Sequence, residues 1–270
     1  LSGDARPLPP IPVNGDTREG VFHFNPPAGR ELGQFRVEAR LFRNGLPVSP
    51  PNELVITRLE RPVHGDRDAP DSPFGVHVQA DPLRAKTLKA GGVNHVRLHD
   101  AGTEYTGWFH LEPERGEWRF RDAELRVYRD SHLGIFGQLG TAPRWASYLS
   151  KADTGRATPS YHDRYFQPFD LKDFRNYVET VCTRYRGVVR EWFVWNEPWN
   201  VGWWAVDYDR NSTANGGYIT SREPQKDFAA LNRVAWERAK AIDPESKIVG
   251  TWTETDPNPP PYEIVDFHFS

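Results

Sequence analysis

The most informative chemical group in this sequence is the carboxylate of Glu197, in the segment WFVWNEPWN at 192–200. It follows the apolar residues 192–195, which are typical of a β-strand that is buried on both faces. A carboxyl group at the end of such a strand lies at the mouth of an apolar cavity, where removal from water favours its protonated form. A general acid needs this form near neutral pH, and such proton transfer typically contributes ~10²- to 10⁴-fold to a rate. Because Pro198 disfavours a helical backbone at the preceding residue, we expect Glu197 to be extended.

Other polar and aromatic residues also follow short apolar strands. In a parallel barrel the reactive groups come from the C-terminal ends of the strands, where the connecting loops converge. We therefore expect these side chains to lie at one face of the fold. They are His77, Arg97, His99, Asp100, Thr141 to Trp145, Asn196, Glu197, Trp252, Glu254 and His268.

Strands that alternate with helices must position these residues. Apolar strands are predicted at 74–78, 95–99, 134–140, 191–197, 247–253 and 264–269. Helices are predicted from apolar residues at helical spacing, namely Leu171, Phe174, Val178, Val181 and Tyr185 in one and Phe228, Leu231, Ala235, Ala239 and Ile242 in another. This alternation requires parallel pairing. Since no Gly-rich phosphate loop follows the first strand, we predict an α/β fold of the (β/α)8 TIM-barrel type, incomplete with six βα units, rather than a doubly wound sheet.

A different pattern precedes the barrel. Residues 21–58 alternate apolar and polar side chains in about three segments, which predicts part of an antiparallel β-sandwich of Ig-like type. We therefore divide the chain into a partial sandwich domain at 1–62 with a loop at its start, a linker at 63–73, and a partial barrel domain at 74–270.

Composition excludes several classes of protein. No apolar run reaches the roughly 18 residues of a membrane span, and the net charge of −3 lacks the basic excess typical of nucleic-acid binding. The single cysteine, Cys182, excludes an internal disulfide, and its apolar neighbours predict inert packing. We expect no cofactor and no metal. The chain starts at Leu1 and contains no methionine, so we expect its natural start to lie elsewhere. The compartment and oligomeric state are left open, with a secreted or periplasmic protein as the expectation.

The motifs resemble those of the retaining (β/α)8 glycoside hydrolases of clan A, whose fourth strand ends in Asn-Glu-Pro. The resemblance covers roughly residues 73–270 and is nearest to family 39 and its neighbours. It rests on Asn196-Glu197-Pro198, Arg97, WFHLEPERGEWRF at 108–120, TAPRWA at 141–146 and VDFHF at 265–269.

The resemblance implies a role for each matching residue. Glu197 would be the general acid and base, and Asn196 would bind the sugar 2-hydroxyl. Arg97 would lie beneath the nucleophile, while His99 and His268 would line the subsite around the cleaved bond. The expected stacking platforms for a plant- or microbe-derived oligo- or polysaccharide are Trp108, Trp145, Trp199, Trp203 and Trp204.

One element of the clan pattern is not found in these 270 residues. Clan members carry the nucleophilic Glu at the end of the seventh strand, so we expect it beyond residue 270 and predict no turnover by these residues alone. Within the sequence, Glu254 is only a weak candidate for this nucleophile. Two other classes stay open: a carbohydrate-binding pseudoenzyme without the nucleophile, and a metal-dependent hydrolase using His77, His99 and His268, which lacks paired-ligand spacing.

Overall fold

The computed structural model describes residues 32–58, 60, 69, 72, 74–155 and 161–250. The chain divides into two compact units, Leu1–Glu60 and Arg61–Ser270. The first of the three antiparallel segments, GVFHFN at 20–25, and the last predicted strand, at 264–269, lie outside the described residues.

The first unit contains an antiparallel ribbon. Strand β1 (Gly33–Ala39) pairs with β4 (Asn52–Arg58), and the short strands β2 (Phe42–Arg43) and β3 (Leu46–Pro47) form a hairpin between them. The hairpin turns through Asn44 and Gly45 with φ of 52° and 80°, as expected for a two-residue loop with the twist of the flanking strands. The sandwich beyond this ribbon stays a prediction.

The second unit is built on a parallel sheet with the strand order β11-β8-β7-β6-β5. Its strands are β5 (Gly75–Val76), β6 (His95–Arg97), β7 (Gly134–Leu139), β8 (Glu191–Val194) and β11 (Lys247–Val249). These are the first five of the six predicted strands, each beside its predecessor in sequence. Sequential parallel strands joined by helices make this unit an incomplete α/β barrel of the TIM type.

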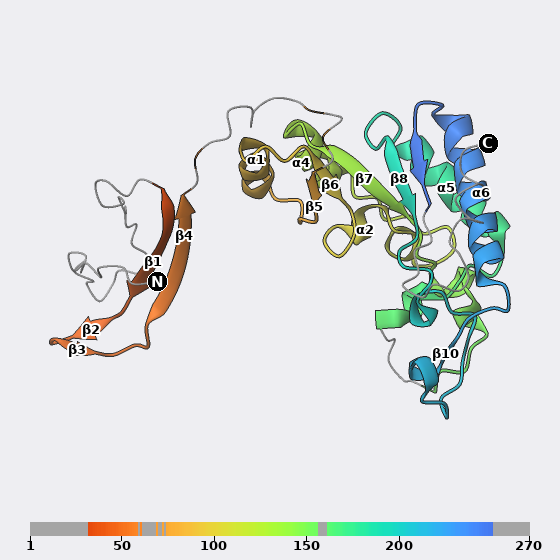
Figure 1. Ribbon diagram of the computed structural model, residues 1–270, viewed down its shortest axis with the longest axis horizontal. Coiled ribbons are helices and arrows are strands. Elements are labelled where there is room, and N and C mark those ends of the chain that lie inside the picture. The colour runs from red at the N-terminus through yellow and green to blue at the C-terminus, as the bar shows by residue number, and fades with distance from the viewer. Residues whose placement is uncertain are drawn as a thin grey trace, which may run out of the picture. The chain divides into compact units, whose positions relative to one another are not determined.

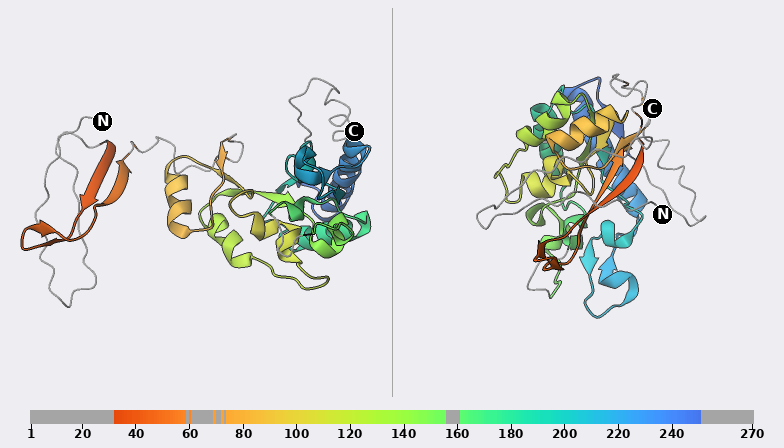
Figure 2. Two further views of the ribbon diagram at one scale, coloured as in Figure 1. Left: turned by 90° about the horizontal axis from the view of Figure 1, so that it is seen from below. Right: turned by 90° about the vertical axis from the view of Figure 1, so that its left-hand side faces the viewer.

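Helices cover one face of the sheet. They are α1 (Pro82–Ala90), α2 (Thr103–Thr106), α3 (Trp108–Leu111), α4 (Asp122–Asp130), α5 (Leu171–Arg184) and α6 (Pro224–Ile242). The last two confirm the predicted helices, and they lie side by side next to β8 and β11 (Figures 1 and 2). Apolar residues on the covering face, including Val96, Ile135 and Trp192, are buried in one core with residues of the helices. Cys182 of α5 belongs to this core, as predicted.

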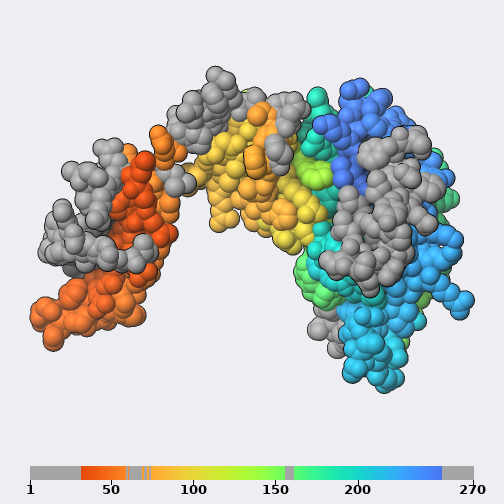
Figure 3. All heavy atoms as spheres, in the orientation of Figure 1, coloured from red at the N-terminus to blue at the C-terminus, as the bar shows by residue number. Residues whose placement is uncertain are grey.

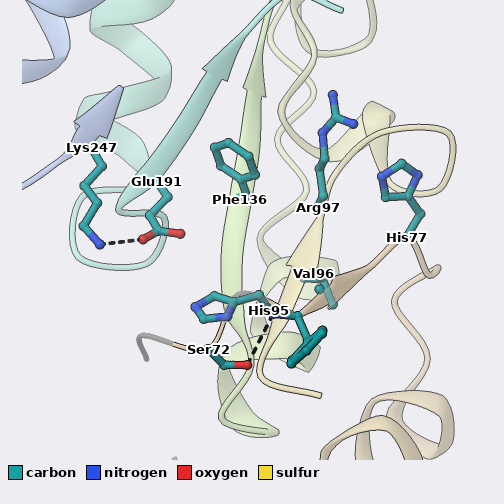
Figure 4. Close-up of a pocket in the computed structure, with 10 residues that line it drawn as sticks. Ser72, His77, His95, Val96, Arg97, Phe136, Glu191 and Lys247 are labelled. Atoms are coloured by element: carbon teal, nitrogen blue, oxygen red, sulfur yellow. Dashed lines mark hydrogen bonds and ion pairs between the residues drawn. The ribbon is translucent and has the colours of Figure 1, made fainter. Parts of the chain in front are cut away.

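The opposite face of the sheet is lined mainly by polar and charged side chains, together with Phe136. Figure 4 shows His77, Arg97, Phe136, Glu191 and Lys247 around a pocket of about 470 Å³, each from a different strand or strand end. Lys247 Nζ and Glu191 Oε1 are 3.0 Å apart and form an ion pair across β11 and β8. Inward-facing side chains of this kind fill the interior of a closed barrel.

Two long connections extend beyond the C-terminal ends of β7 and β8. They contain the short 3₁₀ helices η1 (Arg144–Ala146), η2 (Tyr148–Ser150), η3 (Tyr161–Tyr165), η4 (Val201–Trp203) and η5 (Ala214–Gly217) and the hairpin of β9 (Asp207–Tyr208) with β10 (Tyr218–Ile219). The hairpin projects, in cyan, in Figure 3. Leu149, Phe166, Ala205 and Tyr218 form a second small core that holds the two connections together. No helix within the described residues is long and apolar enough to cross a membrane.

Candidate active site

The end of β6 meets the end of β8 through a direct hydrogen bond. Arg97 Nη2 donates to Asn196 Oδ1 at 2.8 Å, although the two residues are 99 positions apart. Asn196 is only 8% exposed. Because its amide oxygen is engaged by the guanidinium, its amide nitrogen is left to donate to a ligand. Two of the predicted site residues are thus in contact.

Glu197 adopts a backbone conformation that differs from the prediction. Its φ is 49°, in the left-handed region, so the extended geometry expected from Pro198 is wrong. Trp195, two residues earlier, also has a positive φ of 62°. Left-handed conformations are costly for residues with a Cβ, and they cluster at functional sites, where the surrounding structure holds them. The chain leaves β8 through a strained turn that carries Asn196 and Glu197.

The half-buried Glu197 carboxylate lies in the field of Arg97. Burial lowers the pKa of the Arg97 guanidinium, and the charges of Asp100 and Glu197 oppose this effect. The same guanidinium lies over the ring of Phe193, 4.3 Å from its centroid. Within the described ranges the Glu197 carboxylate forms no hydrogen bond. Its oxygens are therefore free to contact a ligand, close to the charge of Arg97.

Two imidazoles flank Asp100 at the end of β6. His77 Nδ1 and His99 Nε2 lie 3.3 Å and 3.4 Å from its carboxylate oxygens. Asp100 has a left-handed φ of 57°, and its side chain is largely exposed. Burial lowers the pKa of His99, with the charge of Asp100 opposing it, so His99 is neutral near pH 7. A neutral imidazole with an exposed carboxylate provides both donors and acceptors for a hydroxylated ligand.

An aromatic group lies next to His99 on the two long connections. Trp203 lies 6.4 Å from the ring of His99 and stacks on Tyr165 with centroids 4.3 Å apart. Tyr161, which is 54% exposed, contacts Trp203 edge-on at 6.3 Å. Of the five predicted tryptophan platforms, Trp203 is the one that these ring contacts link to a predicted site residue.

The other predicted platforms belong to the scaffold. Trp108 is fully buried, stacks on Tyr177 and donates its indole N–H to Glu112 at 2.7 Å. Trp204 is 1% exposed and donates to the carbonyl of Pro224. Since neither ring is accessible, the prediction of stacking platforms is wrong for these two.

Trp145 and Trp199 are partly buried against the main core. Trp145 donates its indole N–H to the Glu112 carbonyl, and Arg115 covers its ring at 4.3 Å. Trp145 also packs edge-on against the buried Trp108 at 5.6 Å, so it too acts as scaffold.

Several predicted residues fall outside the described part of the chain. These are His268, Glu254 and Trp252, so the proposed roles of His268 and Glu254 stay predictions. Among the described residues, no group of three or more His, Cys, Asp or Glu side chains is placed to hold a metal ion. The imidazoles of His77 and His99 instead both lie beside the carboxylate of Asp100.

Sequence reasoning missed part of this arrangement. Phe193 was assigned only to the strand, and Tyr161 and Tyr165 were assigned no role. The aromatic-rich stretch YHDRYFQPF at 161–169 is the sequence signal from which the two tyrosines could have been found. Its partner, Trp203, comes from the other long connection, which could be identified only from the fold.

The arrangement presents the carboxylates of Glu197 and Asp100, the Asn196 amide and neutral or cationic donors at the same end of a parallel sheet, beside the exposed ring of Tyr161 and the partly buried ring of Trp203. A carboxylate there can exchange a proton with a ligand oxygen, while the amide and imidazole groups bind hydroxyls. Aromatic rings offer apolar faces to the C–H surfaces of sugars.

Comparison with known proteins supports the same fold. No family model matches the sequence. A family 39 glycoside hydrolase from Bacteroides cellulosilyticus WH2 matches 82% of this chain with a TM-score of 0.54 and 18% identity, and the chain spans 39% of that structure. A xylanase from Paenibacillus barcinonensis has a lower TM-score of 0.41 at 16% identity, and the match covers 71% of this chain and 52% of the xylanase. A β-galactosidase from Rahnella sp. R3 has a TM-score of 0.43 at 12% identity, and the match covers 70% of this chain and 35% of the β-galactosidase. The chain is therefore similar in fold to a glycoside hydrolase of family 39, which confirms at the level of fold the resemblance seen in its motifs.

Proposed function

We propose that this chain forms part of a glycoside hydrolase that cleaves an O-glycosidic bond of an oligo- or polysaccharide with retention of configuration. The observation that carries the proposal is the convergence of Arg97, Asn196 and Glu197 at the C-terminal ends of β6 and β8, with Glu197 held on a strained turn. The family 39 fold supports the same reaction class by analogy.

The proposed roles follow from the contacts. Glu197 protonates the leaving oxygen and later activates water, because its carboxylate is half-buried and has no hydrogen bond within the described ranges. Asn196 directs its amide nitrogen to a sugar hydroxyl, since Arg97 occupies its oxygen. Retention needs a second carboxylate about 5 to 5.5 Å from the first to attack the anomeric carbon. We assign that role to a Glu on the seventh strand of the complete barrel.

Replacement of Glu197 tests this proposal. In the protein extended through the complete barrel, Glu197→Ala should reduce hydrolysis by roughly 10²- to 10⁴-fold for aryl glycosides with poor leaving groups, and less for activated ones that need little protonation. Azide should restore turnover by attacking the glycosyl-enzyme. Glu191→Gln is the matched control, because Glu191 lies at the opposite end of the same strand and pairs with Lys247. An equal loss for all leaving groups without azide rescue would contradict the role of Glu197.

A further inference from the structure

Asp100 presents an exposed carboxylate at the end of β6 to which the proposed reaction gives no role. Its φ is 57°, and the N–H of Ala101 donates to the carbonyl of His99 at 2.6 Å, which closes a tight three-residue turn around it. Such a turn is strained for a residue with a Cβ, and strained residues cluster where ligands are bound. The turn therefore carries a charged side chain in the kind of position that function retains.

Two imidazoles from different strand ends hold the Asp100 carboxylate, one beside each oxygen. His77 Nδ1 lies 3.3 Å from Oδ2, and His99 Nε2 lies 3.4 Å from Oδ1. Because His99 Nδ1 is buried without a hydrogen-bond partner among the described residues, the proton of the neutral ring belongs on Nε2, where it faces the carboxylate. An ionised carboxylate has about four acceptor sites, so each oxygen keeps a lone pair for a ligand.

Strand geometry and ring contacts place this carboxylate beside the candidate active site. Arg97 and His99 are two residues apart in the extended chain, so they face the same side of the sheet. Both contact the ring of Phe193 in β8. The guanidinium lies 4.3 Å from its centroid, and the imidazole meets it edge-on at 6.3 Å. His99 and the Asp100 carboxylate beside it thus neighbour the hydrogen-bonded pair of Arg97 and Asn196.

The Asp100 carboxylate is also open to a ligand. Its side chain is 65% exposed, and it forms no hydrogen bond within the described part of the chain. His77 and Arg97 line the pocket of about 470 Å³ on the inner face of the sheet, and Figure 4 shows both side chains at the same end of it. Asp100 therefore combines a fixed position, set by two imidazoles, with access from the side on which Asn196 meets Arg97.

We propose that Asp100 binds two neighbouring hydroxyl groups of the sugar unit beside Glu197, one on each carboxylate oxygen, while His77 and His99 fix its orientation. The inference rests on the proposed function and adds a specificity-determining residue to it. A carboxylate only accepts, so both hydroxyls donate charge-assisted hydrogen bonds, which are stronger than neutral ones. Since we assign the 2-hydroxyl to Asn196, the substrate is a sugar unit whose 3- and 4-hydroxyl groups are both free.

Deoxy sugars test this inference on the 270-residue chain. The probes are the methyl β-glycosides of glucose, galactose and xylose, and the 2-, 3- and 4-deoxy analogues of the one that binds most tightly, with Kd measured by ligand-observed NMR titration. Loss of a hydrogen bond to a charged acceptor predicts roughly 10-fold or weaker binding of the 3- and 4-deoxy analogues by the wild-type chain.

Asp100→Asn should remove this discrimination. The parent sugar should bind about as weakly as the 3- and 4-deoxy analogues bind to the wild type, and loss of either hydroxyl should then cost only about 2- to 3-fold, because the remaining acceptor is neutral. The 2-deoxy analogue should lose the same factor in both proteins, since its missing hydroxyl is the one assigned to Asn196. A residue that acted only on the fold would weaken all four ligands equally.

Two further variants complete the test. Asp100→Gly removes the carboxylate and adopts the left-handed conformation without strain, so it should bind the parent sugar as weakly as Asp100→Asn. Asp130→Asn changes an exposed carboxylate of α4 that pairs with Arg129, and it should bind like the wild type.

Equal affinity of the wild-type chain for the parent sugar and its 3- and 4-deoxy analogues overturns the role of Asp100 and leaves the proposed function standing. Undiminished discrimination by Asp100→Asn has the same consequence. Binding of no probe by the wild-type chain overturns both proposals. The wild-type results decide the inference even if a variant fails to fold.

Discussion

The hydrogen bond between Arg97 and Asn196 leads to a prediction that separates stability from ligand binding. Asn196→Ala removes the acceptor that lies 2.8 Å from Arg97 Nη2. Hydrogen bonds to charged groups contribute about 1.5 to 3 kcal/mol. Because Asn196 is 8% exposed and Arg97 is itself partly desolvated, little water can replace the lost acceptor. The free energy of unfolding should therefore fall by about that amount, which urea denaturation would show as a lower midpoint with an unchanged slope.

Asn196→Asp provides the contrast. The aspartate keeps an acceptor for Arg97 and adds a charge to the bond, so the free energy of unfolding should stay close to the wild-type value. It lacks the amide N–H₂ that we assign to the sugar hydroxyl, and it places a negative charge beside Glu197. Saccharide affinity should therefore fall in both variants, by roughly 2- to 10-fold for one neutral hydrogen bond.

Two results would contradict these expectations. An unchanged urea midpoint for Asn196→Ala would show that the hydrogen bond to Arg97 does not stabilise the folded chain. Wild-type saccharide affinity in Asn196→Asp would show that the amide nitrogen does not contact the ligand. In either case the assigned orientation of the Asn196 amide is wrong.

Three further predictions concern burial. Trp204→Ala should lower the free energy of unfolding by about 3 to 5 kcal/mol, because Trp204 is buried. Trp203→Ala should lower the free energy of unfolding by less and should weaken saccharide binding. Equal urea midpoints for the two variants would contradict this prediction. Burial raises the pKa of Cys182 to about 12, so a thiol reagent should label it in urea but not in the native chain; rapid native labelling would contradict this. Burial, and then the charge of Arg164, lower the pKa of His110 below its usual 6.5. The unfolded chain then binds the proton more tightly, so stability should fall as pH drops below about 6.5, and His110→Gln should show a smaller fall between urea midpoints at pH 7 and 5.5.

Local patterns were sufficient to predict the five described strands of the parallel sheet and the two longest helices of the barrel-type unit. The apolar spacing in 171–185 and 228–242 appears as α5 and α6, because helical periodicity places those residues on one buried face. The five described strands occur in the predicted order for a similar reason. A strand that feeds a helix returns to the sheet beside its predecessor.

Residue type and local spacing also singled out Asn196 and Glu197 as candidates, because they directly follow a buried strand and match the Asn-Glu-Pro pattern of the clan. Only the tertiary structure placed the Asn196 oxygen on Arg97 and distinguished Trp203, which lies beside His99, from Trp204, which is buried in the core. These two tryptophans are adjacent and chemically identical, so their sequence contains nothing that separates them. Similarly, the restriction that Pro198 places on Glu197 is a local preference, and the turn that leaves β8 overrides it. Burial and contact depend on groups brought together by folding across many residues, and this information is absent from any short segment of the chain.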